Sequence, residues 1–125
     1  MKIDFASQKL EDAAHGEKNG TFSELSKIIR RADGKNSQII PSHIGEVLND
    51  LLAANTCADL PPSTHPHPLQ GDRKGEFVVD IPHQRGRGKF RIIFRPNHTN
   101  DQNFRIDNPK TITKITIIEL CCDYH

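Results

Sequence analysis

Three adjacent side chains at the end of the sequence, Asp123, Tyr124 and His125, are suited to acid–base chemistry. A carboxylate accepts hydrogen bonds, a phenol can donate one or stack on another ring, and an imidazole titrates near neutral pH. Together such groups can move protons to or from a substrate. A polar tail without function has the same composition, so the interpretation depends on the rest of the chain.

A second set of candidate residues is basic and lies between residues 72 and 95. The formal net charge of the whole chain is only +1. Seven basic side chains stand against three acidic ones in this window, namely Arg73, Lys74, Arg85, Arg87, Lys89, Arg91 and Arg95 against Asp72, Glu76 and Asp80. A local basic patch can bind a polyanion even when the chain is nearly neutral. RNA or another phosphate-rich partner therefore competes with the simpler interpretation of a solvent-exposed face.

Two other motifs are weak. His65 and His67 are separated by one residue, but they lie among prolines and lack a second ligand pair at zinc spacing. The segment 86–88, Gly-Arg-Gly, lacks the helix and the further residues of a phosphate-binding loop, and a tight hairpin explains it equally well. Neither motif predicts a metal or cofactor site.

The candidate residues lie on or beside predicted strands. Lys114–Leu120 is rich in β-branched residues, and polar side chains return at steps of two, which predicts a strand with one face on a core. Such a strand would hold the following residues 123–125 in a defined place. Two more strands are predicted at Glu76–Ile81 and Lys89–Phe94, and Met1–Phe5 is predicted to be a short edge strand.

Three helices are predicted before these strands. Ser7 can cap the first helix, and a capping box at residues 21–24 can begin the second. Ser42, after Pro41, can cap the third. Five residues are predicted to form the core-facing stripe of the third helix: Ile44, Val47, Leu48, Leu51 and Leu52. A connector rich in proline and histidine follows at residues 60–69.

Helices first and strands last predict an α+β fold, in which helices cover one face of an antiparallel sheet and leave the other face for function. The 125 residues predict a single domain, residues 1–125. No segment resembles a membrane span or an apolar signal sequence, so we expect a cytoplasmic protein without a membrane partner. The cysteines, Cys57, Cys121 and Cys122, match neither a disulfide framework nor a zinc motif and are predicted to be buried or inert thiols.

Four segments carry a family resemblance. They are residues 67–75 (HPLQGDRKG), 90–94 (FRIIF), 117–119 (IIE) and 123–125 (DYH). In this order they resemble the HigB-type toxins, also called plasmid-maintenance killer proteins, of the RelE/ParE superfamily. Residues 2–7 and 58–62 are similar as well, so the likeness spans nearly the whole chain except residues 32–40 and the loop near residue 100.

The resemblance implies a RelE-like α+β domain with N-terminal helices packed on a small, twisted, mainly antiparallel sheet. It implies a ribosome-dependent endoribonuclease that cleaves messenger RNA in the ribosomal A site without a metal or cofactor. The implied partners are the ribosome, its mRNA and a cognate HigA-like antitoxin. This antitoxin would be a helix-turn-helix DNA-binding protein, and the chain would contact operator DNA only through it. In this chemistry a ribose 2′-hydroxyl attacks the adjacent phosphate, which requires a base, cations for the phosphate and an acid for the leaving 5′-oxygen.

The resemblance also implies which residues act. The catalytic residues would be His67, Arg73, Arg91, Asp123, Tyr124 and His125. The histidines and Asp123 would transfer protons, with the base and the acid not distinguished, while the arginines would hold the phosphate through rigid forks and Tyr124 would stack on a base. The expected RNA-binding residues are Lys74, Arg85, Arg87 and Lys89.

One position departs from the family pattern. Gln70 stands where the family commonly has a catalytic lysine, and a glutamine donates hydrogen bonds but carries no charge. This difference predicts a slower or conditionally active toxin. Two alternatives remain open at this point: a decayed toxin that only binds its antitoxin or the ribosome, and a ParE-like inhibitor of DNA gyrase, for which a terminal acid–base cluster is not needed.

Overall fold

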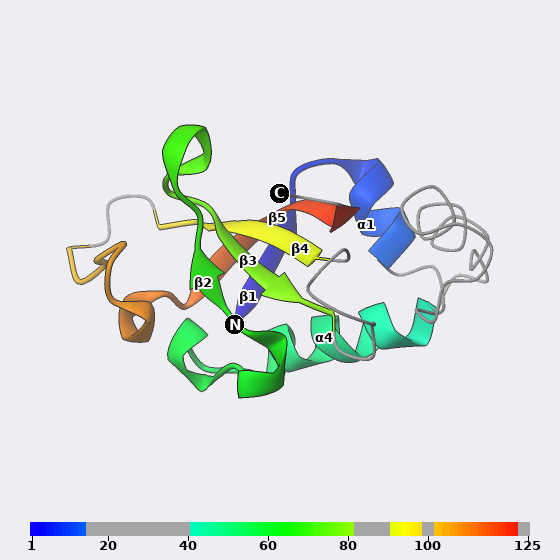
Figure 1. Ribbon diagram of the computed structural model, residues 1–125, viewed down its shortest axis with the longest axis horizontal. Coiled ribbons are helices and arrows are strands. Elements are labelled where there is room, and N and C mark those ends of the chain that lie inside the picture. The colour runs from blue at the N-terminus through cyan, green and yellow to red at the C-terminus, as the bar shows by residue number, and fades with distance from the viewer. Residues whose placement is uncertain (15–40, 82–90, 99–101, 123–125) are drawn as a thin grey trace.

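The computed structural model describes residues 1–14, 41–81, 91–98 and 102–122, and these residues build a five-stranded sheet. The strands are β1 (Lys2–Phe5), β2 (His67–Pro68), β3 (Phe77–Asp80), β4 (Arg91–Pro96) and β5 (Lys114–Cys122). Their order across the sheet is β1-β5-β4-β3-β2. β1 runs parallel to β5, and the other three pairings are antiparallel, so the sheet is mixed (Figure 1).

Strand β5 lies between β1 and β4, and its pairing with β4 shifts register at Cys121 and at a β-bulge at Ile118. Ile117 lies opposite Phe94 while Glu119 lies opposite Ile93, so Ile118 is an extra residue on β5. Strict alternation would place Glu119 on the same face as Ile117. The bulge instead returns Leu120 to the main core with Ile117 and leaves Glu119 on the other face.

Strand β2 differs from the prediction. Residues 60–69 were expected to be a connector, but His67 and Pro68 pair with Val78 and Phe77 of β3. A proline can occupy this position because β2 is the edge strand, where a missing N–H leaves no ladder bond unmade.

Helix α1 spans Gln8–Ala14 and its predicted start is confirmed. The hydroxyl of Ser7 accepts a hydrogen bond from the backbone N–H of Leu10 at 3.2 Å, which satisfies one of the free donors of the first turn. Helix α4 spans Pro41–Ala53 and lies along one side of the sheet (Figure 1). The predicted cap at Ser42 is wrong, because Ser42 lies within the helix and Pro41 occupies its first position. The predicted helix that begins at residues 21–24 lies outside the described residues.

The core lies between α4 and one face of the sheet. Four of the five predicted residues of the helix stripe are buried in it, but Leu52 is 53% exposed and that part of the prediction is wrong. At about 100° per residue, Leu52 lies roughly 80° from Ile44 and falls at the margin of the stripe. The sheet contributes Phe77, Val79, Ile92, Phe94, Ile115, Ile117 and Leu120. Within the described residues, no helix has both the length and the apolar character needed to span a bilayer.

Cys57 is buried against this core, as predicted, and its burial has a measurable consequence. Burial raises the pKa of the Cys57 thiol from an ordinary value of 9.0 to about 12, although the nearby N-terminal ammonium opposes the shift. Between these values the unfolded chain loses the proton and the folded chain keeps it, so folding stability falls as pH rises. We expect the free energy of unfolding to drop by up to about 2 kcal/mol between pH 8 and pH 10.5 through this thiol.

Urea denaturation at the two pH values, with Cys57→Ala as the comparison, measures this effect. The variant should lose less stability over the same range, because the other titrating groups are unchanged. An equal loss in both proteins would show that the thiol does not contribute.

Candidate functional site

The sheet face away from α4 carries a small apolar patch surrounded by charged residues, and we call it the open face. Leu69, Val78 and Ile93 are buried in this patch with Ile118 packed against them, and they form a cluster separate from the main core. Since residues opposite one another on adjacent strands share a face, the pairings His67–Val78 and Ile93–Glu119 place His67 and Glu119 on this face.

His67 is held in one tautomer by the backbone. Its Nδ1 lies 2.8 Å from the carbonyl oxygen of His65. A carbonyl only accepts, so Nδ1 carries the hydrogen in this contact and Nε2 is left as the acceptor of the neutral ring. The residue that supplies the carbonyl, His65, has a left-handed backbone with φ of 46°. The neutral ring of His67 therefore presents a basic nitrogen.

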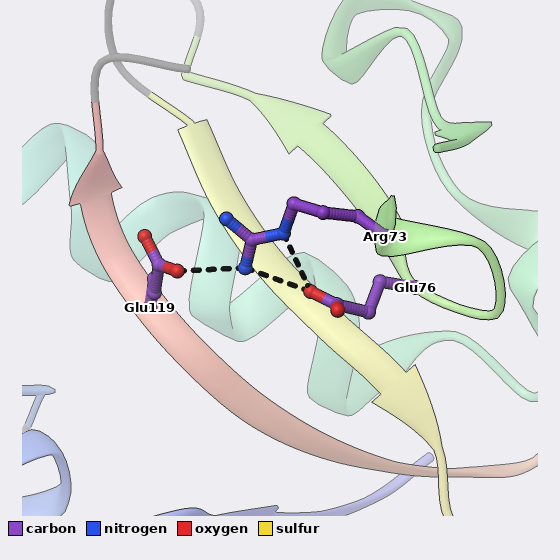
Figure 2. Close-up of polar contacts among 3 residues, drawn as sticks. All are labelled: Arg73, Glu76 and Glu119. Atoms are coloured by element: carbon purple, nitrogen blue, oxygen red, sulfur yellow. Dashed lines mark hydrogen bonds and ion pairs between the residues drawn. The ribbon is translucent and has the colours of Figure 1, made fainter. Parts of the chain in front are cut away.

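Arg73 bridges the loop before β3 to strand β5. Its Nε donates to Oε1 of Glu76 at 2.9 Å, and one terminal nitrogen donates to Oε1 of Glu119 at 2.6 Å. Figure 2 shows the side chain reaching across β4 to Glu119. These hydrogen bonds, first to Glu76 and then to Glu119, raise the pKa of the guanidinium further above its ordinary value. The three residues form an ion-pair cluster, which we call the arginine clamp.

Two glycines shape the loop that carries Arg73. Gly71 and Gly75 have φ of 66° and 98°, a region that other L-residues rarely adopt. Open space surrounds the position of a Cβ at both glycines, so the backbone angle rather than crowding favours glycine. These are the glycines of the segment 67–75 that carries part of the family resemblance.

The second predicted catalytic arginine is also ion-paired. Nε of Arg91 lies 3.1 Å from Oδ1 of Asp80, its cross-strand partner on β3. The distance permits an ion pair, but these two atoms are not aligned as a hydrogen bond. Both side chains are largely buried, which strengthens their electrostatic attraction.

The structure thus brings His67, Arg73 and Arg91 onto one face but pairs both arginines with carboxylates. Sequence reasoning missed these carboxylates, which are Glu76, Glu119 and Asp80. The missing information was the strand register. Only that register reveals Asp80 opposite Arg91, and only the bulge turns Glu119 toward Arg73.

The remaining predicted residues are placed as follows. Lys74 and Gln70 are exposed in the loop before β3. Arg85, Arg87, Lys89 and the triplet 123–125 lie outside the described residues. Cys122, which immediately precedes Asp123 in the chain, pairs with Arg91. Across the ranges that the structure describes, no cluster of three or more His, Cys, Asp or Glu side chains is arranged to hold a metal.

The arginine clamp predicts a measurable coupling between Arg73 and Glu119. We expect a double-mutant cycle with Arg73→Gln and Glu119→Gln to give an interaction energy of about 1 kcal/mol in urea denaturation. The value stays small because Glu119 is 40% exposed and solvent screens the pair. The matched cycle uses Lys74→Gln with Glu119→Gln and should give a value near zero. Equal coupling in both cycles would mean that the clamp does not hold in solution.

No protein-family model matches the chain, and no curated protein matches it. Among solved structures, a YoeB/ParE toxin from Agrobacterium tumefaciens is similar, with a TM-score of 0.49 and 17% sequence identity over 99% of this chain and 100% of that one.

Proposed function

We propose that this chain is the toxin of a type II toxin–antitoxin pair and acts as a ribosome-dependent mRNA endoribonuclease. One observation carries the proposal: β2, the loop before β3 and β4 bring His67, Arg73 and Arg91 onto the open face. These are three of the residues that the resemblance to HigB-type toxins assigns to catalysis. The partners would be a HigA-like antitoxin, the ribosome and its mRNA.

The fixed tautomer of His67 supports an assignment of roles. Nε2 of His67 would take the proton of a ribose 2′-hydroxyl, whose oxygen then attacks the adjacent phosphorus. The bond from phosphorus to the 5′-oxygen breaks as this oxygen takes a proton from His125. The products are a 2′,3′-cyclic phosphate and a free 5′-hydroxyl. Tyr124 would stack on a neighbouring base, and Asp123 would assist the proton transfers.

The arginines would act on the phosphate only after a change of partners. Arg73 and Arg91 contact three carboxylates, so an RNA phosphate must compete with these groups for the guanidinium donors. A guanidinium has five N–H donors and can hold more than one anion. Even so, the nearby negative charges weaken phosphate binding, which supports slow cleavage.

The same ion pairs support a second candidate function. A homologue that binds its antitoxin or the ribosome without cleaving RNA would not need exposed cations at the phosphate. Gln70, in place of the family lysine, is consistent with this alternative. The two candidates differ in whether RNA is cut.

An in-vitro translation reaction with a defined message tests the proposal. The intact chain is compared with a version that lacks residues 123–125, and primer extension maps cuts in the message. The nuclease proposal expects cuts that require both ribosomes and the triplet, with naked RNA as the control. Ribosome binding without cuts from either version would instead establish the binding-only function.

Gln70 offers a gain-of-function prediction in the same assay. Gln70→Lys should increase the initial cleavage rate by about tenfold, because a charged donor stabilises a phosphate roughly 1 to 2 kcal/mol better than a neutral one. Gln70→Met, which has similar length and no charge, is the control and should not increase the rate. An unchanged rate for Gln70→Lys would mean that this position does not limit cleavage.

A further inference from the structure

A cavity of about 480 Å³ opens where the segment after α4, the β2 edge of the sheet and the loop before β5 meet. Its volume lies within the range of about 300 to 1,000 Å³ that is usual for small-molecule sites. The wall is mainly carbon and includes Leu60, Pro68, Phe77 and Ile106. Ile106 is 46% exposed, so an apolar surface remains open to a ligand.

We propose that this cavity binds the base of an RNA nucleotide close to the bond that is cleaved. The inference rests on the proposed function, because it takes RNA as the substrate. It adds a nucleotide-binding site that lies beside the open face and contains none of the arginines of that face.

The chemistry of the rim favours a nucleotide over a purely apolar ligand. Gln70, Lys74 and Asp107 line the cavity beside its apolar wall. A nucleobase has apolar faces and a polar edge, so its faces can pack on Pro68 and Ile106 while its edge reaches the polar groups of the rim. The Lys74 ammonium can hold the attached phosphate, which would lie away from the Asp107 carboxylate.

Continuity with the proposed site is the second argument. His67 lines the cavity and also lies on the open face. A nucleotide with its base in the cavity is thus beside the histidine assigned as the base, and the next nucleotide along the strand can reach the arginines. An apolar side chain from a protein partner would fill the same wall, but it would cover Gln70 and Lys74 without giving them hydrogen bonds.

Binding can be measured directly by methyl NMR on the intact chain without ribosomes. The probes are AMP, GMP, CMP and UMP, with ribose 5-phosphate as a probe that lacks the base. We expect saturable shifts of the Leu60 and Ile106 methyl signals with at least one nucleotide and none with ribose 5-phosphate. Ile106→Asn should weaken that binding roughly three- to tenfold, followed on the Leu60 methyls, because apolar contact area is lost.

Leu52→Asn is the matched control, since Leu52 is a similarly exposed apolar residue that does not line the cavity. It should leave nucleotide binding unchanged. Lys74→Gln should lower the affinity for the nucleotides and reduce the salt dependence of their binding.

Three results would overturn the inference. The first is that ribose 5-phosphate shifts the methyl signals as much as the nucleotides do. The second is that Ile106→Asn binds nucleotides as well as the wild type. The third is that N-acetylleucinamide shifts the methyl signals while no nucleotide does. The last result would make the cavity a docking site for a protein partner. Ribosome-dependent cleavage without nucleotide binding would overturn only the proposal that the cavity binds a nucleotide. Nucleotide binding without cleavage would support that proposal and contradict the proposed endoribonuclease activity.

Discussion

Replacing Phe94 with alanine is expected to lower the free energy of unfolding by about 3 to 5 kcal/mol, the usual cost of removing a buried aromatic side chain. Phe94 is fully buried in the main core. Its ring stacks on Phe77 with centroids 6.0 Å apart and an interplanar angle of 14°. Phe94 also lies opposite residues of both neighbouring strands, Phe77 of β3 and Ile117 of β5, so a cavity there loosens the middle of the sheet.

Urea denaturation of the wild type and Phe94→Ala measures this loss. Leu52→Ala is the control, because the exposed Leu52 side chain should change stability by less than about 0.5 kcal/mol. A loss below about 1 kcal/mol for Phe94→Ala would contradict the position of this residue in the core.

The second large effect concerns catalysis. His67→Gln should reduce ribosome-dependent cleavage by about 10²- to 10⁴-fold, the typical contribution of a general base. Glutamine retains a polar side chain of similar length but cannot take a proton at neutral pH. Primer extension under single-turnover conditions would report the rate, and ribosome binding of the variant should be retained.

The matched control for this effect is His65→Asn. His65 contributes its backbone carbonyl to His67, and its ring lies 4.9 Å from the His67 ring in a tilted contact. Asparagine removes the ring contact but keeps the carbonyl and tolerates the left-handed backbone that His65 adopts. Cleavage by His65→Asn should therefore stay within a few-fold of the wild type. Wild-type cleavage by His67→Gln would remove His67 from the catalytic residues.

How much of this structure is available from the sequence differs from element to element. Strands β3, β4 and β5 were located to within two residues, because their apolar patterns are strong and turn residues bound them. The edge strand β2 was missed because it is two residues long and contains Pro68, which normally argues against a strand. The start of α4 and the exposure of Leu52 differed from the predictions, because a local sequence pattern leaves the ends and margins of a helix uncertain by about a residue or two.

The candidate site shows a different limit. The histidine and the arginines could be selected from residue type and family resemblance, but their partners depend on strand register and on one bulge. The arginine clamp joins residues 46 positions apart, Arg73 and Glu119, and no local pattern in the sequence encodes that contact. The cavity likewise combines Leu60, Phe77 and Ile106 from three separate segments of the chain.

The bulge at Ile118 also determines where the chain can change in length. Because Ile118 is the additional residue, deleting it would restore regular pairing with β4 from Ile115 to Leu120, and Glu119 and Leu120 would keep their present faces. Deleting Thr116 instead would reverse the side chains of Lys114 and Ile115 relative to the rest of β5. In homologues aligned over β5, a one-residue gap is therefore expected at this position, inside a strand, where insertions and deletions are normally excluded.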